Sequence, residues 1–110
     1  MVGATVEVML ISDERIETGK IQGDVRVVSG GHITLGGMIT GTLTVESGGV
    51  ATVGGMVGGL VIHPGASATL GGMCTGDVVN HGGDLSIGGV VTGALYGREN
   101  TYVAPGSRIG

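Results

Sequence analysis

The stretch GGMITG at residues 36–41 decides the fold, because the chain repeats it with small changes. Similar stretches follow at steps of 18, 17 and 17 residues, as GGMVGG (54–59), GGMCTG (71–76) and GGVVTG (88–93). Alignment on the paired glycines divides the chain into five units, at residues 18–35, 36–53, 54–70, 71–87 and 88–103. A fixed short period is typical of proteins in which each repeat stacks on its neighbours.

Glycines recur at the same two places of every unit and mark its corners. The second position is Gly19, Gly37, Gly55, Gly72 and Gly89, and the sixth is Gly23, Gly41, Gly59, Gly76 and Gly93. A further turn signal follows in four units, as SGG (29–31), SGG (47–49), PGA (64–66) and HGG (81–83). Glycine allows tight turns and close backbone approach, so we predict bends at these positions. The same density of glycine argues against helices.

Aliphatic residues alternate with other residues between the corners. The fourth position is Ile21, Ile39, Val57, Cys74 and Val91, and the eighth is Val25, Leu43, Val61, Val78 and Leu95. The last position is Leu35, Val53, Leu70, Ile87 and Val103. Alternation bounded by turn signals predicts short strands. We therefore predict an all-β fold, a single-domain β-solenoid of about five to six rungs of 17–18 residues, in which each column becomes a ladder of stacked side chains.

Composition agrees with a thin aliphatic core. The 110 residues include 26 glycines, 41% are hydrophobic and only 2% are aromatic. Collagen is excluded because glycine does not recur at every third position, and the hydrophobic content argues against disorder. We expect the solenoid over residues 18–110, preceded by a capping or flanking segment at residues 1–17. The spacing alone leaves the handedness of the coil open.

Charge and hydropathy limit the partners. The formal net charge is −4, and residues 27–97 contain no Lys or Arg. Such a surface repels phosphate backbones and offers bases no aromatic platform, so nucleic acid is not an expected partner. No apolar run approaches the roughly 20 residues of a membrane span. The first residues also lack the features of a signal peptide, so the cytoplasm is the expected location.

The repeat is similar to that of a known family. The pattern G-x-I/V-x-G-D/T-V/L-x-V is best matched by GKIQGDVRVVSGGHITLGGMITGTLTV at residues 19–45, and it continues in weaker form to about residue 95. This sequence resembles the bactofilins, which are polymer-forming cytoskeletal proteins of bacteria. The resemblance implies a compact right-handed β-helix that stacks end to end, without nucleotide, into filaments or sheets.

No constellation of residues points to catalysis. The glycine-rich stretches lack the GK[ST] ending and the following helix of a phosphate loop. His63 and His81 are expected on adjacent rungs at a corner, but His32 lies in another column, so no zinc site is predicted. The single cysteine, Cys74, shares a column with aliphatic residues and is expected to be a small buried hydrophobe. We therefore expect no enzyme, no cofactor, no metal and no small-molecule substrate.

The third position of the units is the candidate interaction site. It is occupied by Lys20, Met38, Met56, Met73 and Val90. Because the fourth position must face inward, strand alternation turns the third outward and creates a surface stripe with three methionines. Exposed apolar stripes mark contacts, and methionine adapts to irregular partners. Two alternatives stay open: a corner bends this column inward, or residues 2–11 fold back over it.

Two functions are expected from this pattern. The first is a structural protein, bactofilin-like, that polymerises or oligomerises with itself through its ends or through the methionine stripe. Open ends recruit further strands unless they are capped, and the net charges of residues 1–26 and 98–110 have opposite signs. The alternative is a discrete protein-binding module, such as an immunity or inhibitor protein that occludes a partner toxin with a flat face or with corner loops.

Overall fold

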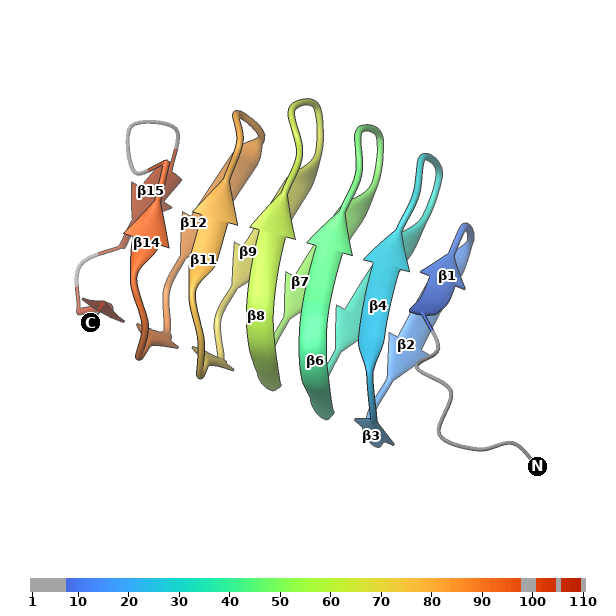
Figure 1. Ribbon diagram of the computed structural model, residues 1–110, viewed down its shortest axis with the longest axis horizontal. Helices are drawn as coiled ribbons and strands as arrows, with labels where there is room; N and C mark the ends of the chain where they lie inside the picture. Colours follow the sequence, from blue (N-terminus) through green and yellow to red (C-terminus); the bar gives the residue numbers. More distant parts are fainter. Residues whose placement is uncertain (1–7, 98–100, 105, 110) are drawn as a thin grey trace.

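Each repeat unit folds into one coil of short strands, and successive coils stack side by side (Figure 1). The computed structural model describes residues 8–97, 101–104 and 106–109, and these residues form strands and turns but no helix. The strands are β1 (Val8–Ile11), β2 (Glu14–Glu17), β3 (Lys20–Ile21), β4 (Asp24–Val27), β5 (His32–Leu35), β6 (Met38–Val45), β7 (Val50–Val53), β8 (Met56–Ile62), β9 (Ser67–Leu70), β10 (Met73–Cys74), β11 (Val78–Asn80), β12 (Asp84–Ile87), β13 (Val90–Val91), β14 (Leu95–Tyr96), β15 (Thr101–Val103) and β16 (Arg108–Ile109).

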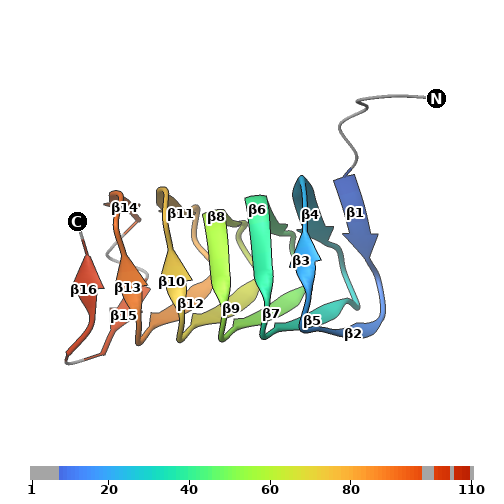
Figure 2. The same ribbon diagram turned by 90° about the horizontal axis from the view of Figure 1, so that it is seen from below.

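The strands form two parallel sheets whose hydrogen bonds join neighbouring coils. One sheet has ten strands and follows the path β1-β4-β6-β8-β10-β13-β16, with β3, β11 and β14 beside it; the other has the order β15-β12-β9-β7-β5-β2. The ten-stranded sheet folds over two faces of the coil, and the six-stranded sheet closes the third (Figure 2). In Figure 1 the chain runs up the near face, over the top and down the far face while it advances from right to left. The coil is therefore right-handed.

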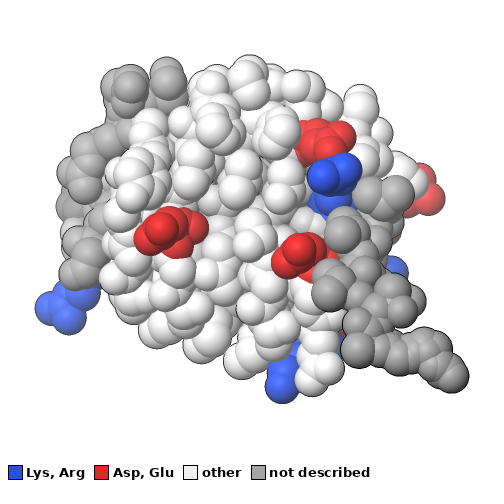
Figure 3. Space-filling model, in the orientation of Figure 1, with Lys and Arg blue, Asp and Glu red and all other residues white. Residues whose placement is uncertain are grey.

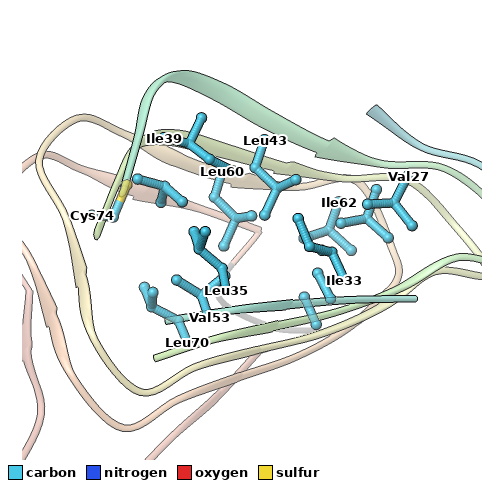
Figure 4. Packing of buried hydrophobic residues seen from close by; sticks show 14 of the residues in the cluster. Val27, Ile33, Leu35, Ile39, Leu43, Val53, Leu60, Ile62, Leu70 and Cys74 are labelled. Carbon is cyan, nitrogen blue, oxygen red and sulfur yellow. The ribbon is translucent and has the colours of Figure 1, made fainter. Parts of the chain in front are cut away.

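The predicted columns form the core. Successive coils bring into register Ile21, Ile39, Val57, Cys74 and Val91. Successive strands of the other sheet align Leu35, Val53, Leu70 and Ile87. All of these side chains are buried, and Figure 4 shows examples from both sheets pointing toward one another across the narrow interior. Burial of each aliphatic side chain stabilises the fold by about 1.5–3 kcal/mol. The stacked, buried columns confirm the predicted solenoid.

One predicted column is wrong by one residue. Leu43 pairs with Leu60 and not with Val61, which pairs with Thr44. The unit 54–70 has one residue fewer before this strand position, where the pairing between β6 and β8 shifts its register. Leu60 is therefore fully buried, whereas Val61 faces away from the core and is half-buried.

Two of the corners of a coil require glycine for different reasons. At the first corner, a Cβ atom on Gly55 would overlap the carbonyl oxygen of Gly37 in the preceding coil. The same overlap would arise between Gly72 and Gly55 and between Gly89 and Gly72, so no side chain fits along this column. At the second corner, Gly48 has a φ of +84°, in the left-handed region that favours glycine.

Asn80 is the one buried polar side chain among the described residues, and it completes a shortened turn. It pairs in register with Ile62, so it occupies an inward position. Its Oδ1 accepts hydrogen bonds from the backbone N–H groups of Gly82 and Gly83, at 3.0 and 2.8 Å. Its Nδ2 donates to the Gly83 carbonyl at 3.1 Å and to Thr101 Oγ1 at 3.0 Å. In the longer turns of other coils, a backbone carbonyl accepts the corresponding hydrogen bond, as Glu46 does from Gly49. In this turn the Asn80 side chain is the acceptor.

Both sheets begin before the first repeat unit. β1 pairs with β4 and β2 pairs with β5, so residues 8–17 add a strand to each sheet ahead of residue 18. These strands form the N-terminal edge of the solenoid (Figure 1). A capping role for the segment 1–17 stays a prediction, and residues 1–7 of that segment lie outside the described residues.

Candidate interaction surfaces

The short strands of one face align the third repeat position into a continuous column. From the first to the last coil, this column consists of Lys20, Met38, Met56, Met73, Val90 and Arg108. We call Met38, Met56 and Met73 the methionine stripe. These three side chains are half-buried, whereas the basic side chains at both ends of the column are exposed. The column therefore presents an apolar centre between two positive charges.

The structure bears on both alternatives to an exposed stripe. No methionine of the stripe belongs to the buried core cluster, so a corner does not turn the column inward. Of the segment 2–11, the part in β1 pairs with β4 and does not lie over the stripe. Residues 2–7 lie outside the described residues. The role of the stripe in binding stays a prediction.

An ion pair lies at the N-terminal end of the solenoid. Arg15 and Glu17 pair in register with the core residues Ile33 and Leu35, so they occupy inward positions. The Arg15 guanidinium donates a hydrogen bond to the Glu17 carboxylate at 3.1 Å. Ile16, between them, faces the other way and is 69% exposed. The sequence pattern missed this pair because no double-glycine signature precedes it to align it with the core columns.

The C-terminal end is more apolar in the described residues. β14, β15 and β16 each pair on one side only. Leu95 and Val103 continue two core columns and are half-buried. Tyr96 and Tyr102 face outward and are 55% and 63% exposed. Tyr102 ends the outward column of the six-stranded sheet that begins at Ile16. The inward positions are therefore charged at the N-terminal end and apolar at the C-terminal end. The outward column has an exposed apolar side chain at both ends, Ile16 and Tyr102.

Charged side chains are sparse on the face formed by β4, β6, β8, β11 and β14 (Figure 3). Asp24 and Asp77 each accept a hydrogen bond at 2.9 Å from a backbone N–H of the next coil. Glu46 forms an ion pair with Arg26, with 2.9 Å between Arg26 Nε and the carboxylate. These carboxylates bind neighbouring coils to each other, and their role is structural. The repeat alignment did not reveal it, because the aspartates occur in only two units.

Among the residues that the structure describes, the three histidines and Cys74 do not gather in one cluster. His63 and His81 are neighbours on adjacent coils, as predicted, whereas His32 lies on β5 in the other sheet. In the part of the chain that the structure describes, no three His, Cys, Asp or Glu side chains are placed to hold a metal ion. Cys74 is buried, and burial raises the pKa of its thiol, which makes it a poor nucleophile.

An open hollow of about 520 Å³ at the N-terminal end is lined by residues 11–16.

Comparisons with family models, with curated proteins and with solved structures give no match to this chain. Among the described residues, no helix is long and apolar enough to cross a membrane. Function is therefore inferred from the two ends of the solenoid and from the methionine stripe.

Proposed function

We propose that the protein is a non-catalytic structural protein that assembles with copies of itself, as bactofilins do, through the ends of its solenoid or through the methionine stripe. The observation that carries this proposal is the set of described strands paired on one side only: β1, β2 and β3 at one end, and β14, β15 and β16 at the other. Such edges expose backbone N–H and C=O groups that the strands of a second copy can pair.

Head-to-tail stacking would continue the six-stranded sheet with compatible side chains on its outward face. If β2 of one copy follows β15 of another in the existing register, Ile16 comes to lie beside Tyr102. Both side chains are largely exposed in the single chain, and each would cover the other. A cross-strand pair of an aromatic and a β-branched side chain contributes about 0.2–1 kcal/mol. A contact between unlike ends builds an open filament when the stacked solenoids share one axis, as continued strand pairing requires.

The methionine stripe offers a lateral contact in addition to the ends. Its side chains are unbranched and flexible, so they fill the irregular gaps between two packed surfaces. Lys20 and Arg108 at the ends of the column would lie at the rim of such a contact, where charges stay in water. Association through this face would join solenoids side by side.

Negative-stain microscopy and sedimentation velocity test self-assembly. Tyr102→Arg places a charge in the end contact, and Met56→Asp places one in the stripe. Thr69 is an exposed outward residue of the six-stranded sheet, two coils before Tyr102 and on a different sheet from the stripe, so Thr69→Arg and Thr69→Asp are the matched controls. We expect assemblies from the unmodified chain and from both controls, and their loss in Tyr102→Arg or Met56→Asp. A monomer at every concentration of the unmodified chain would contradict the proposal.

A second function is favoured by the ion pair at the N-terminal end. Stacking on this end would remove Arg15 and Glu17 from water, which costs free energy, and inward-pointing charges are a known means of blocking edge association. A solenoid blocked at one end suits a discrete protein-binding module, such as an immunity or inhibitor protein that occludes a partner toxin. A single sharp species in sedimentation, unchanged by Met56→Asp and Tyr102→Arg, would support this function, and filaments would exclude it.

A further inference from the structure

Two imidazoles occupy equivalent positions at the second corner of neighbouring coils. His63 follows β8 and donates its backbone N–H to the Val45 carbonyl at 2.9 Å; His81 follows β11 and donates to the Ile62 carbonyl at 2.8 Å. The two turns lie side by side at the upper edge of the solenoid in Figure 1. The ring centroids are 5.9 Å apart, with an angle of 75° between the planes. The fold thus holds two nitrogen ligands next to each other.

We propose that His63 and His81 form a chelating pair for a divalent transition-metal ion such as Cu²⁺ or Zn²⁺. Metal–nitrogen distances of about 2.1 Å place the ring centres of two imidazoles on one ion roughly 4.5–6 Å apart. The separation of 5.9 Å lies within this range, so the two rings are already at a spacing that one shared ion requires. Imidazole ligands select copper, nickel and zinc over magnesium and calcium, which prefer oxygen.

The surroundings make this a two-ligand site that is open to solvent. His81 is exposed and His63 is half-buried, so the ion enters from water and keeps water as its remaining ligands. Glu46 holds the equivalent position one coil before His63. Its carboxylate is paired with Arg26 at 2.9 Å, so the two imidazoles supply the protein ligands.

The ion would connect two coils of the solenoid. The ligands are adjacent in space because β8 and β11 pair, although a full repeat separates them along the chain. An unfolded chain does not hold them together, so the ion binds the folded state more tightly and stabilises it. Metal binding would thus link the coil that contains Pro64 to the coil with the shortened turn at Asn80.

Isothermal titration calorimetry of the full chain with Cu²⁺ tests the site. His63→Gln and His81→Gln each remove one imidazole while they retain a polar side chain of similar size. His32→Gln is the matched control, because His32 lies on the six-stranded sheet. We expect one ion for each chain in the unmodified protein and in His32→Gln. Either of the other variants should bind at least about tenfold more weakly, because the second ligand no longer acts at high effective concentration.

Thermal unfolding provides an independent measurement. Zn²⁺ should raise the unfolding midpoint of the unmodified chain and of His32→Gln but not of His81→Gln, and Mg²⁺ should change none of them. Circular dichroism establishes that each variant retains its strands. If His63→Gln does not fold, the test is the comparison of His81→Gln with the unmodified chain, because His81 is exposed. Equal Cu²⁺ affinity in the unmodified chain and His81→Gln, or loss of binding in His32→Gln, overturns the proposal.

Discussion

At the first corner of each coil, the carbonyl oxygen of one glycine lies where the next glycine of the column would carry a side chain. The backbones can stack at this distance only because Gly37, Gly55, Gly72 and Gly89 lack a Cβ atom. The repeated double glycine predicts this corner directly. The sequence does not predict the burial of Asn80. Its side chain is buried because the turn after it is shorter and uses its oxygen as a hydrogen-bond acceptor.

Gly55→Ala should destabilise the fold by about 3 kcal/mol or more, because the added methyl group overlaps the Gly37 carbonyl and forces two coils apart. Gly54→Ala is the matched control. A Cβ atom at Gly54 would meet the Leu35 carbonyl at 3.6 Å, an ordinary contact, so we expect a change within about 1 kcal/mol. Urea unfolding measures both, and equal midpoints would contradict the close approach at this corner.

Asn80→Val gives the coil the type of side chain that Val45 and Ile62 supply at the same column position. We nevertheless expect a loss of about 1–3 kcal/mol, because the N–H groups of Gly82 and Gly83 lose their acceptor and that of Gly83 is buried. Thr101→Val, which removes the hydroxyl that Asn80 Nδ2 contacts, should cost less. Denaturant unfolding compares the two; a fully stable Asn80→Val variant would show that the turn needs no side-chain acceptor.

Strands of this solenoid are positioned by pairing with their neighbours, and the repeat alignment predicts that pairing wherever the corresponding segments of two units have equal length. The alignment placed the methionine stripe correctly in register, because its column lies directly after the double glycine. It failed after the fourth position of the unit 54–70, where one residue is missing before Gly59, so that the alignment placed Val61 in the column that Leu60 occupies. A one-residue slip exchanges the inward and outward faces of a strand, so such errors change burial completely.

Leu60→Asp and Val61→Asp test the register of β8. Leu60 is fully buried among core side chains, so a carboxylate there should cost about 4 kcal/mol or prevent folding. Val61 faces outward between Thr44 and Val79, and its substitution should cost about 1 kcal/mol or less, because the new carboxylate reaches water. Circular dichroism and denaturant unfolding distinguish the two. The reverse order of effects would support the register expected from the sequence.

The whole molecule is a stack in which each coil contacts mainly the coils before and after it, so its two ends have the largest influence on assembly. The N-terminal end carries Arg15 and Glu17 at inward positions, and the C-terminal end continues core columns with Leu95 and Val103. The sequence predicted open, charged ends, but it could not show that two of the charges face inward. That result required the pairing of β2 with β5.

Removal of the N-terminal ion pair should strengthen end-to-end association. The double variant Arg15→Val, Glu17→Leu places aliphatic side chains at the inward positions and removes the cost of desolvating two charges. We expect a lower protein concentration for the onset of assembly, measured by light scattering against the unmodified chain. An unchanged onset would show that the ion pair does not limit stacking at this end.

Because the hydrogen bonds between strands all run along the long axis, a force that separates the two termini would load the coils in series. Each coil would detach as a unit, and its 17–18 residues would lengthen the unfolded part of the chain by roughly 60 Å. Single-molecule stretching would then record a force–extension curve with regularly spaced peaks. The height of each peak is the force that separates one coil from the next.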